Sequence, residues 1–207
     1  MFNRSTWSFV IGLILAFSAI NVYAFQAGKD YKLVAEPQPT STGEKIEILE
    51  FFWYGCPHCN SFEPFLNTWK ASKPANVEFI RVPAVFRPSW KVQARTYYAL
   101  EAMGKIEEVH GQIFDAIHKR RTKLNSLEQM ADFLADKGID KEAFIKQYRS
   151  FSIDGKVRKA NKLVKDYKIS GVPTVIINGK YMTDGRSAGS YDKMIAVMNH
   201  LIKEESK

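Results

Sequence analysis

The stretch Glu50–Glu63 reads EFFWYGCPHCNSFE and joins a strand pattern to a helix pattern across a pair of cysteines. Residues 46–53 are β-branched, aliphatic or aromatic apart from two glutamates, which is typical of a largely buried strand. A glycine ends that run, and Pro57 suits the first turn of a helix because a proline there leaves no N–H unpaired. Apolar residues at helical spacing follow. We therefore predict that Cys56 and Cys59 lie at a strand-to-helix turn.

Outward from this stretch, the pattern predicts three blocks of structure. Residues 77–82 form a second strand, which completes a β-α-β unit. From residue 90 to 167 the apolar period is helical and no strand is expected. Residues 172–177 read as a strand that meets Asn178-Gly179, the strongest short hairpin signal, and residues 190–202 read as an amphipathic helix. The chain is therefore α/β, in the order β-α-β, helical block, β-β-α.

The first 24 residues are typical of a targeting signal rather than of part of the folded domain. Arg4 supplies a short positive region, residues 9–17 form an apolar core, and residues 22–24 give a small-x-small cleavage site. The alternative is an uncleaved membrane anchor, but the apolar core is shorter than the ~20 residues that a spanning helix needs. We expect a cleaved signal peptide and an exported, soluble mature chain that starts near Phe25.

Composition excludes several classes of protein. The chain has 207 residues, of which 45% are hydrophobic and 13% aromatic, so it can bury a core and is not a disordered chain. Two cysteines are too few for a disulfide scaffold. The net charge of +8 comes from scattered basic residues, including residues 119–123 and 156–165, and no nucleic-acid motif accompanies them. We expect solvated basic surfaces and no nucleic-acid partner.

Three interpretations fit the spacing of Cys56 and Cys59: a reactive pair, an inert structural disulfide and a zinc site. A structural bridge across so short a loop would remove little entropy from the unfolded chain. A zinc site would need a second pair of ligands, but there is no other cysteine, and His110, His118 and His200 lack the close spacing of a zinc motif. We expect no metal and a reactive pair.

Position on the helix predicts different roles for the two thiols. Cys56 at the helix start can face the unpaired N–H groups of the first turn and the positive end of the helix dipole, which favour a thiolate. His58 either tunes that thiolate or is a solvated loop histidine. We expect Cys56 to be the exposed nucleophile and the inward-facing Cys59 to be the resolving thiol with the higher pKa.

These motifs resemble the DsbA family of bacterial periplasmic disulfide oxidants. Glu50–Glu63 is similar to the active-site segment of that family, and Gly171–Thr174, followed by residues 178–181, is similar to its cis-proline loop. The resemblance covers essentially the whole mature chain and implies a thioredoxin fold with an inserted helical subdomain. We expect residues 25–87 and 168–207 to form the two parts of the thioredoxin fold, and residues 88–167 to form the inserted helical subdomain.

The resemblance also implies a catalytic cycle in the periplasm. A Cys56–Cys59 disulfide, with no other cofactor, would oxidise unfolded exported proteins that carry free thiols, and a membrane DsbB-type, quinone-linked partner would reoxidise the protein. Val172 would pair with an extended substrate, and the bond before Pro173 would be cis. We expect a monomer. The alternatives are a disulfide isomerase or reductase on the same motif, and a thioredoxin-like binding protein without turnover.

Two glutamates flank the cysteine motif. Glu50 interrupts the apolar strand six residues before Cys56, where a buried carboxylate must be hydrogen-bonded or protonated. It is either a proton-handling acid near Cys59 or a structural acid at the strand end. We expect Glu63 to be an electrostatic neighbour rather than a catalyst. Residues 81–86 depart from the pattern of the best-known family members, so we expect a different substrate groove.

Overall fold

Five strands form one mixed sheet in the order β1-β5-β4-β2-β3. The computed structural model describes residues 25–207, and the predicted signal peptide, residues 1–24, lies outside the described residues. β2 pairs in parallel with β3 and antiparallel with β4, and the remaining pairs are antiparallel. The strands are β1 Lys32–Leu33, β2 Ile46–Phe52, β3 Val77–Pro83, β4 Thr174–Ile177 and β5 Tyr181–Asp184.

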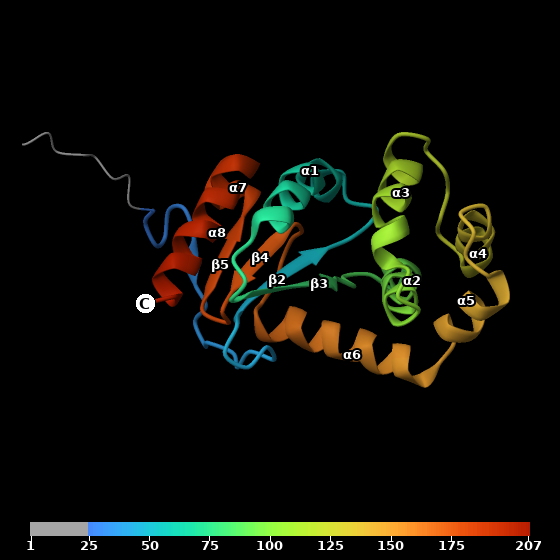
Figure 1. Ribbon diagram of the computed structural model, residues 1–207, viewed down its shortest axis with the longest axis horizontal. Helices are drawn as coiled ribbons and strands as arrows, with labels where there is room; N and C mark the ends of the chain where they lie inside the picture. Colours follow the sequence, from blue (N-terminus) through green and yellow to red (C-terminus); the bar gives the residue numbers. More distant parts are fainter. Residues whose placement is uncertain (1–24) are drawn as a thin grey trace, which may run out of the picture.

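Helices cover both faces of this sheet, as Figure 1 shows. α1, α7 and α8 pack on one face, α6 packs on the other, and α2 to α5 extend the molecule beyond the end of β2. The prediction of a thioredoxin fold with a helical insertion is confirmed. The helices are α1 Pro57–Ser72, the 3-10 turn Pro88–Trp90, α2 Lys91–Ala102, α3 Ile106–His118, α4 Leu127–Ala135, α5 Lys141–Tyr148, α6 Phe151–Asp166, α7 Gly185–Ala188 and α8 Tyr191–Glu205.

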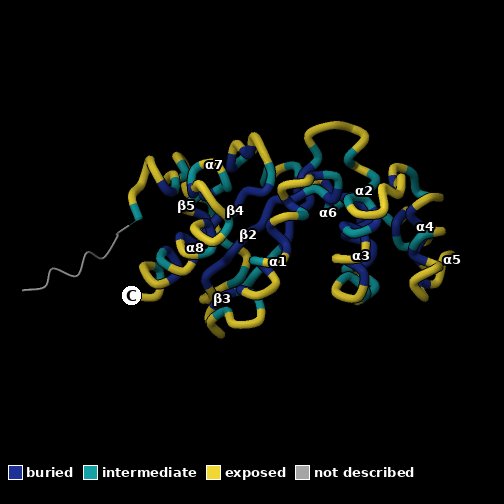
Figure 2. Tube along the Cα trace, turned by 90° about the horizontal axis from the view of Figure 1, so that it is seen from above, coloured by how far each residue is buried: buried dark blue, intermediate teal, exposed yellow. Residues whose placement is uncertain are grey.

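Alternate residues of β2 enter two different hydrophobic cores. Ile46 and Ile48 pack with α1 and α8, whereas Leu49 and Phe51 pack with α6 and the inserted helices. Every residue of β2 is buried, and Figure 2 shows this strand dark along its length. A strand that is covered on both faces reads as a continuous apolar run, which explains the pattern of the sequence.

β4 and β5 form a hairpin, and the residues before β4 lie beside the end of β2. Asn178 and Gly179 both have positive φ, 49° and 68°, and the Lys180 N–H donates to the Ile177 carbonyl at 3.0 Å. A Cβ on Gly179 would lie 2.1 Å from a backbone oxygen, so only glycine fits there. The predicted hairpin is confirmed. Because Thr174 pairs with Phe51, the residues before β4 lie beside the residues that follow β2.

Polar side chains cap α4 and α5 and connect α6 to α2. The side chains of Ser126 and Asp140 cap α4 and α5 by accepting backbone N–H bonds at 3.2 and 2.6 Å. Asp154 lies one turn inside α6, whose first residue follows Ser150. Its carboxylate forms an ion pair with Arg95 of α2, which ties α6 to α2.

Candidate active site

The first turn of α1 is built around the sulfur of Cys56. Cys56 is the N-cap residue, with extended backbone angles of −87° and 116°, and its N–H donates to the Trp53 carbonyl at 3.0 Å. Pro57 is the first helical residue, and the Cys59 N–H donates to Cys56 Sγ at 3.4 Å. The sulfur therefore occupies the place that a serine or aspartate oxygen takes at an ordinary helix start. A negative charge is favoured there.

The two thiols, both free, have pKa values that shift in opposite directions. The hydrogen bond from the Cys59 thiol, together with the N–H groups of Cys59 and His58 and the charge of His58, outweighs burial and lowers the pKa of Cys56 from 9.0 to about 6. Burial and the neighbouring Cys56 raise the pKa of Cys59 well above 9.0. The geometry thus makes Cys56 the thiolate and Cys59 its proton-bearing neighbour.

Cys56 is more enclosed than the sequence suggested. Its exposed fraction is 7% and that of Cys59 is 0%, so Cys56 is the more accessible thiol but not an exposed one. The reason is the loop before β4, because the Val172 carbonyl oxygen lies 3.4 Å from Cys56 Sγ. The Val172–Pro173 peptide bond is cis, as the resemblance implied. Val172, one of the two predicted substrate-binding residues, therefore contacts the cysteine directly.

His58 lies on the exposed side of the motif. Its Nδ1 is 3.3 Å from the hydroxyl of Tyr191, the first residue of α8, so the ring is positioned by the second half of the fold. From here its charge makes a small contribution to the lowered pKa of Cys56.

Two tryptophans flank the cysteines on the other side. The Trp53 and Trp90 rings stack with centroids 3.8 Å apart and planes at 6°. The Trp53 ring lies over Gly55, where an added Cβ would be 2.2 Å from the ring. Residue 55 must therefore be glycine for the strand end to pass beneath this stack. The contact also fixes the start of α2 beside the active site.

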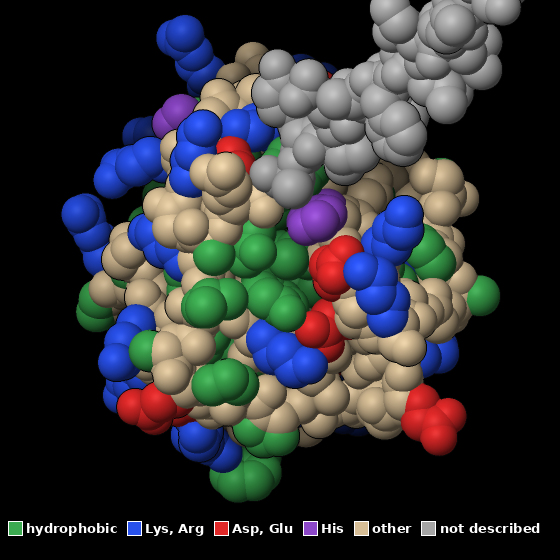
Figure 3. Space-filling model, turned by 90° about the vertical axis from the view of Figure 1, so that its left-hand side faces the viewer, with side chains coloured by type: hydrophobic (Ala, Val, Ile, Leu, Met, Phe, Trp, Pro, Cys, Tyr) green, Lys and Arg blue, Asp and Glu red, His purple; other side chains and the backbone are tan. Residues whose placement is uncertain are grey.

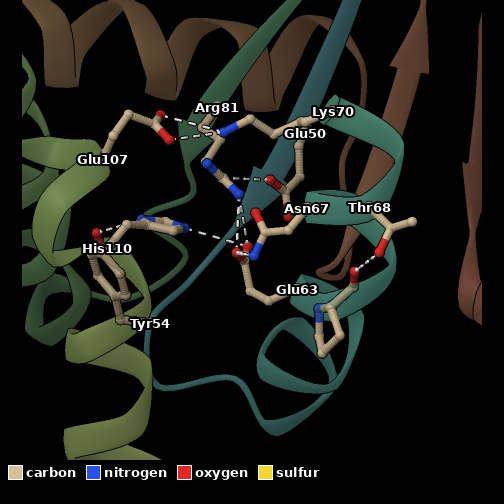
Figure 4. A network of polar contacts seen from close by, with 10 residues as sticks. Glu50, Tyr54, Glu63, Asn67, Thr68, Lys70, Arg81, Glu107 and His110 are labelled. Carbon is tan, nitrogen blue, oxygen red and sulfur yellow. Dashed lines mark hydrogen bonds and ion pairs between the residues drawn. The ribbon is translucent and has the colours of Figure 1, made fainter. Parts of the chain in front are cut away.

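A buried polar network connects Glu50, Glu63, Arg81, His110 and Tyr54 (Figure 4). Arg81, from β3, donates its Nε to Glu50 at 3.0 Å and its terminal nitrogen to both oxygens of Glu63, at 3.0 and 3.1 Å. His110, from α3, connects Glu63 to the hydroxyl of Tyr54 through contacts of 3.3 and 2.8 Å. The network thus joins β2, β3, α1 and α3 behind the active site.

The two carboxylates of this network differ in their protonation. Burial raises the pKa of Glu50 to about 7, against the attraction of Arg81, and one oxygen of Glu50 has no hydrogen-bond partner. Burial also acts on Glu63, but the contacts from His110 and Arg81 outweigh it and lower the pKa of Glu63. Burial lowers the pKa of His110, so its neutral ring accepts from Tyr54 and donates to Glu63.

Sequence reasoning singled out Glu50 and Glu63 but missed the residues that pair with them. Arg81 drew notice only as part of a departure from the family pattern, and His110 only as a poor zinc ligand. A signal for Arg81 was present, because it is the one charge among the apolar residues in the second half of β3, and it lies directly opposite Glu50 in the β2–β3 register. Nothing in the local sequence indicates His110.

A cleft of about 690 Å³ opens between α1 and α3 and reaches this network. Glu63, Arg81 and His110 line it together with Asn60 and Lys119. Water can therefore approach the network from the α1–α3 side, away from Cys56. Within residues 25–207, no group of three or more His, Cys, Asp or Glu side chains is arranged to hold a metal ion, and no helix is long and apolar enough to cross a membrane.

A thiolate at a helix start, a buried partner thiol and a cis-proline loop across the sulfur define a thiol–disulfide oxidoreductase of the thioredoxin fold. The model of the DSBA-like thioredoxin domain family matches residues 47–193. The chain belongs to this family, and its resemblance to the DsbA sequences is confirmed.

Curated relatives agree with this assignment. Thiol:disulfide interchange protein DsbA of Pseudomonas aeruginosa is 46% identical over 181 residues, which are 87% of this chain and 86% of the relative. The protein of the same name from Azotobacter vinelandii is 43% identical and covers 95% and 96% of the two chains. The crystal structure of Pseudomonas aeruginosa DsbA superposes with a TM-score of 0.85 at 46% identity, over 88% of this chain and 95% of that one.

Proposed function

We propose that this oxidoreductase works as a dithiol oxidase, which introduces disulfide bonds into exported proteins through Cys56 and Cys59. The observation that carries the proposal is the stabilised thiolate of Cys56 at the start of α1. Stabilising a thiolate favours the dithiol form over the disulfide, so the oxidised protein tends to take electrons from its substrates.

The size of this effect follows from the pKa of Cys56. A fall from 9.0 to about 6 favours the reduced form at pH 7 by about 1.4 kcal/mol, or about 30 mV. A folded-state pKa below the unfolded value stabilises the reduced protein fully above pH 9.0, and that stabilisation is lost as the pH falls through 6. The protein should therefore become a stronger oxidant, relative to an unperturbed dithiol, as the pH rises between these values.

The proposed reaction moves two electrons from a substrate dithiol to the protein; of the two protons that the dithiol loses, one ends on Cys59 and the other goes to solvent. A substrate thiolate attacks Cys56 Sγ of the Cys56–Cys59 disulfide, the S–S bond breaks, and Cys59 leaves as a thiolate that takes up a proton. A second substrate thiolate then attacks the substrate sulfur of the mixed disulfide and releases Cys56 as its stable thiolate. The substrate gains a disulfide and the protein becomes the dithiol.

Each residue around the motif has a role in this proposal. Pro57 opens the helix, His58 tunes the Cys56 thiolate, and the backbone of Val172 beside the cis Pro173 pairs with an extended substrate.

Two carboxylates would assist from beneath. Glu50, with its raised pKa and unpartnered oxygen, gives the proton that Cys59 takes up. Glu63 holds Arg81 in place as its electrostatic neighbour.

The proposal includes a cellular setting. The protein would act as a monomer in the periplasm, after cleavage of residues 1–24, on unfolded proteins with free thiols. A DsbB-type membrane partner linked to quinone would restore the disulfide. No metal, nucleic acid or further cofactor takes part. The alternative on the same residues is a disulfide isomerase or reductase, for which the dithiol would be the active form.

The redox equilibrium with glutathione tests the direction of catalysis. We expect the protein to be reduced by far lower glutathione concentrations than a thioredoxin-like couple requires. Because Cys56 ionises near pH 6 and glutathione as an ordinary thiol, the equilibrium constant should favour reduced protein about 30-fold more at pH 8 than at pH 6. A thioredoxin-like potential, or an equilibrium constant independent of pH, would overturn the oxidase proposal in favour of a reductase.

A further inference from the structure

Two surface segments near the active site carry basic side chains and no acidic ones. Residues 84–100 and 116–127 contain no aspartate or glutamate. Six exposed basic side chains lie on them, and together we call these the basic rim: Arg87, Lys91, Lys119, Arg120, Arg121 and Lys123.

Contacts place both segments at the active-site end of the molecule. Trp90, next to Lys91, stacks on Trp53, three residues before Cys56. His118, which precedes Lys119, lies with its Nε2 2.7 Å from the Tyr54 carbonyl, two residues before Cys56.

The two segments also contact each other. The Gln93 amide of α2 donates to the Leu124 carbonyl of the loop after α3, at 3.3 Å. The two segments that carry the basic rim are therefore joined to each other next to the active site.

The charge of this surface is largely unneutralised. Within the described residues, one member of the basic rim forms an ion pair, Lys119 with Asp115 of α3 at 2.8 Å. The Arg120 guanidinium donates to the Gln112 carbonyl, which is neutral. By contrast, Lys156 and Lys162 of α6 pair with acidic side chains. On the face around α8, Figure 3 shows basic and acidic side chains interspersed around a hydrophobic centre.

We propose that the basic rim selects substrates whose reacting cysteine lies in an acidic stretch of unfolded polypeptide. The inference rests on the proposed function, because a substrate that reaches Cys56 must bring the residues next to its cysteine against the surrounding surface. Exposed charges act over roughly 8 Å at physiological salt and raise the rate of encounter with a partner of opposite charge. Acidic residues a few positions from the cysteine come within that range.

The test compares two unfolded peptides that share their two cysteines and differ in the flanking residues, which are glutamate in one and lysine in the other. The second-order rate constant for oxidation by the disulfide form is measured at low and at high salt. We expect the glutamate peptide to react about three- to tenfold faster at low salt, with the difference lost at high salt.

Two triple variants remove equal charge from different surfaces. Arg120→Gln/Arg121→Asn/Lys123→Gln removes three cations from the basic rim, and asparagine suits residue 121 because its φ is 55°. Lys159→Gln/Lys162→Gln/Lys165→Gln removes three exposed cations from α6, on the opposite face of the sheet from α1. The preference should disappear in the first variant and persist in the second.

The outcomes separate this inference from the proposed function. Oxidation of neither peptide would remove the oxidase proposal and the basic rim with it. Equal oxidation of both peptides, or equal loss of preference in both variants, would overturn the basic rim alone. Sedimentation with anionic phospholipid vesicles is measured on the same proteins. If the rim variant loses vesicle binding while its peptide rates are unchanged, the surface is a membrane contact and the inference is wrong.

Discussion

The thiols of Cys56 and Cys59 lie at the two ends of the first turn of α1, and their pKa values shift in opposite directions. At the start of the turn, Cys56 accepts the Cys59 N–H and its pKa falls to about 6. Three residues later, Cys59 is fully buried and its pKa rises well above 9.0. A thiol that replaces a capping oxygen meets unpaired donors, whereas a thiol inside the turn meets the apolar core. Position on the helix, rather than residue type, creates the asymmetry that disulfide exchange requires.

The two carboxylates of the buried network, Glu50 and Glu63, also have pKa values that shift in opposite directions. Glu63 receives two contacts from Arg81 and one from His110, and its pKa is lowered. Glu50 receives a single bond from the same arginine, keeps one oxygen without a partner, and its pKa is raised to about 7. In both pairs, the number of donors that reach the charged atom decides the sign of the shift.

The largest effect should come from removing one thiol at a time. Cys56→Ser should abolish oxidation of substrate dithiols, since the attacked sulfur is gone. Cys59→Ser should also stop turnover, but its Cys56 thiolate should attack disulfides already present in exported proteins, expel one substrate thiolate and accumulate as mixed disulfides, because no Cys59 thiol remains to displace the bound substrate. Non-reducing electrophoresis of exported proteins, followed by mass spectrometry, identifies the trapped species.

The two cysteine variants are each other's control. Trapping by Cys59→Ser and none by Cys56→Ser is the expected result. Equal trapping by both variants would mean that the two sulfurs are interchangeable nucleophiles, and the asymmetry inferred from the helix start would be wrong.

The next largest effect should come from Arg81, which holds both carboxylates of the network. Arg81→Met leaves Glu50 and Glu63 buried without their shared cation, and breaking such a pair costs about 3–5 kcal/mol in the free energy of unfolding. Urea denaturation of the reduced protein at pH 7 measures this loss.

A rescue variant separates lost charge from lost packing. Adding Glu50→Gln and Glu63→Gln to Arg81→Met removes the unpaired charges and should recover most of the lost stability. If the triple variant is no more stable than Arg81→Met alone, packing of the arginine side chain dominates, and the network does not depend on charge balance.

The contrast between the two regions also separates what the sequence reveals from what it hides. The helix start could be predicted because its evidence is local: a buried run, a glycine, a proline and two cysteines all lie between residues 46 and 59. The hairpin was predictable for the same reason, since an Asn-Gly pair specifies its own turn.

The hidden features depend on residues that are distant along the chain. The enclosure of Cys56 comes from Val172, 116 residues away, and His110 is 47 residues from the Glu63 that it contacts. Arg81 meets Glu50 only through the register of two parallel strands, which neither strand specifies alone. A charge inside an apolar strand signals that a partner exists, but only the fold identifies it.

The smallest effect should come from Glu50→Gln, which tests whether the raised pKa serves proton transfer. Glutamine can still accept the bond from Arg81 but cannot give a proton to Cys59. We expect the cleavage of the Cys56–Cys59 disulfide by a substrate thiol to slow about tenfold, the low end for a positioned general acid. In the wild type, the rate should fall as the pH rises through about 7, beyond the change due to the substrate thiol, because the carboxyl loses its proton there.

Glu63→Gln is the matched control for this experiment, because Glu63 also binds Arg81 but has a lowered pKa and is already ionised at neutral pH. It should keep the pH transition near 7 that Glu50→Gln loses. If Glu50→Gln changes unfolding stability but leaves both the rate and its pH profile as in the wild type, Glu50 is a structural acid at the end of β2. The two regions would then be linked by packing alone.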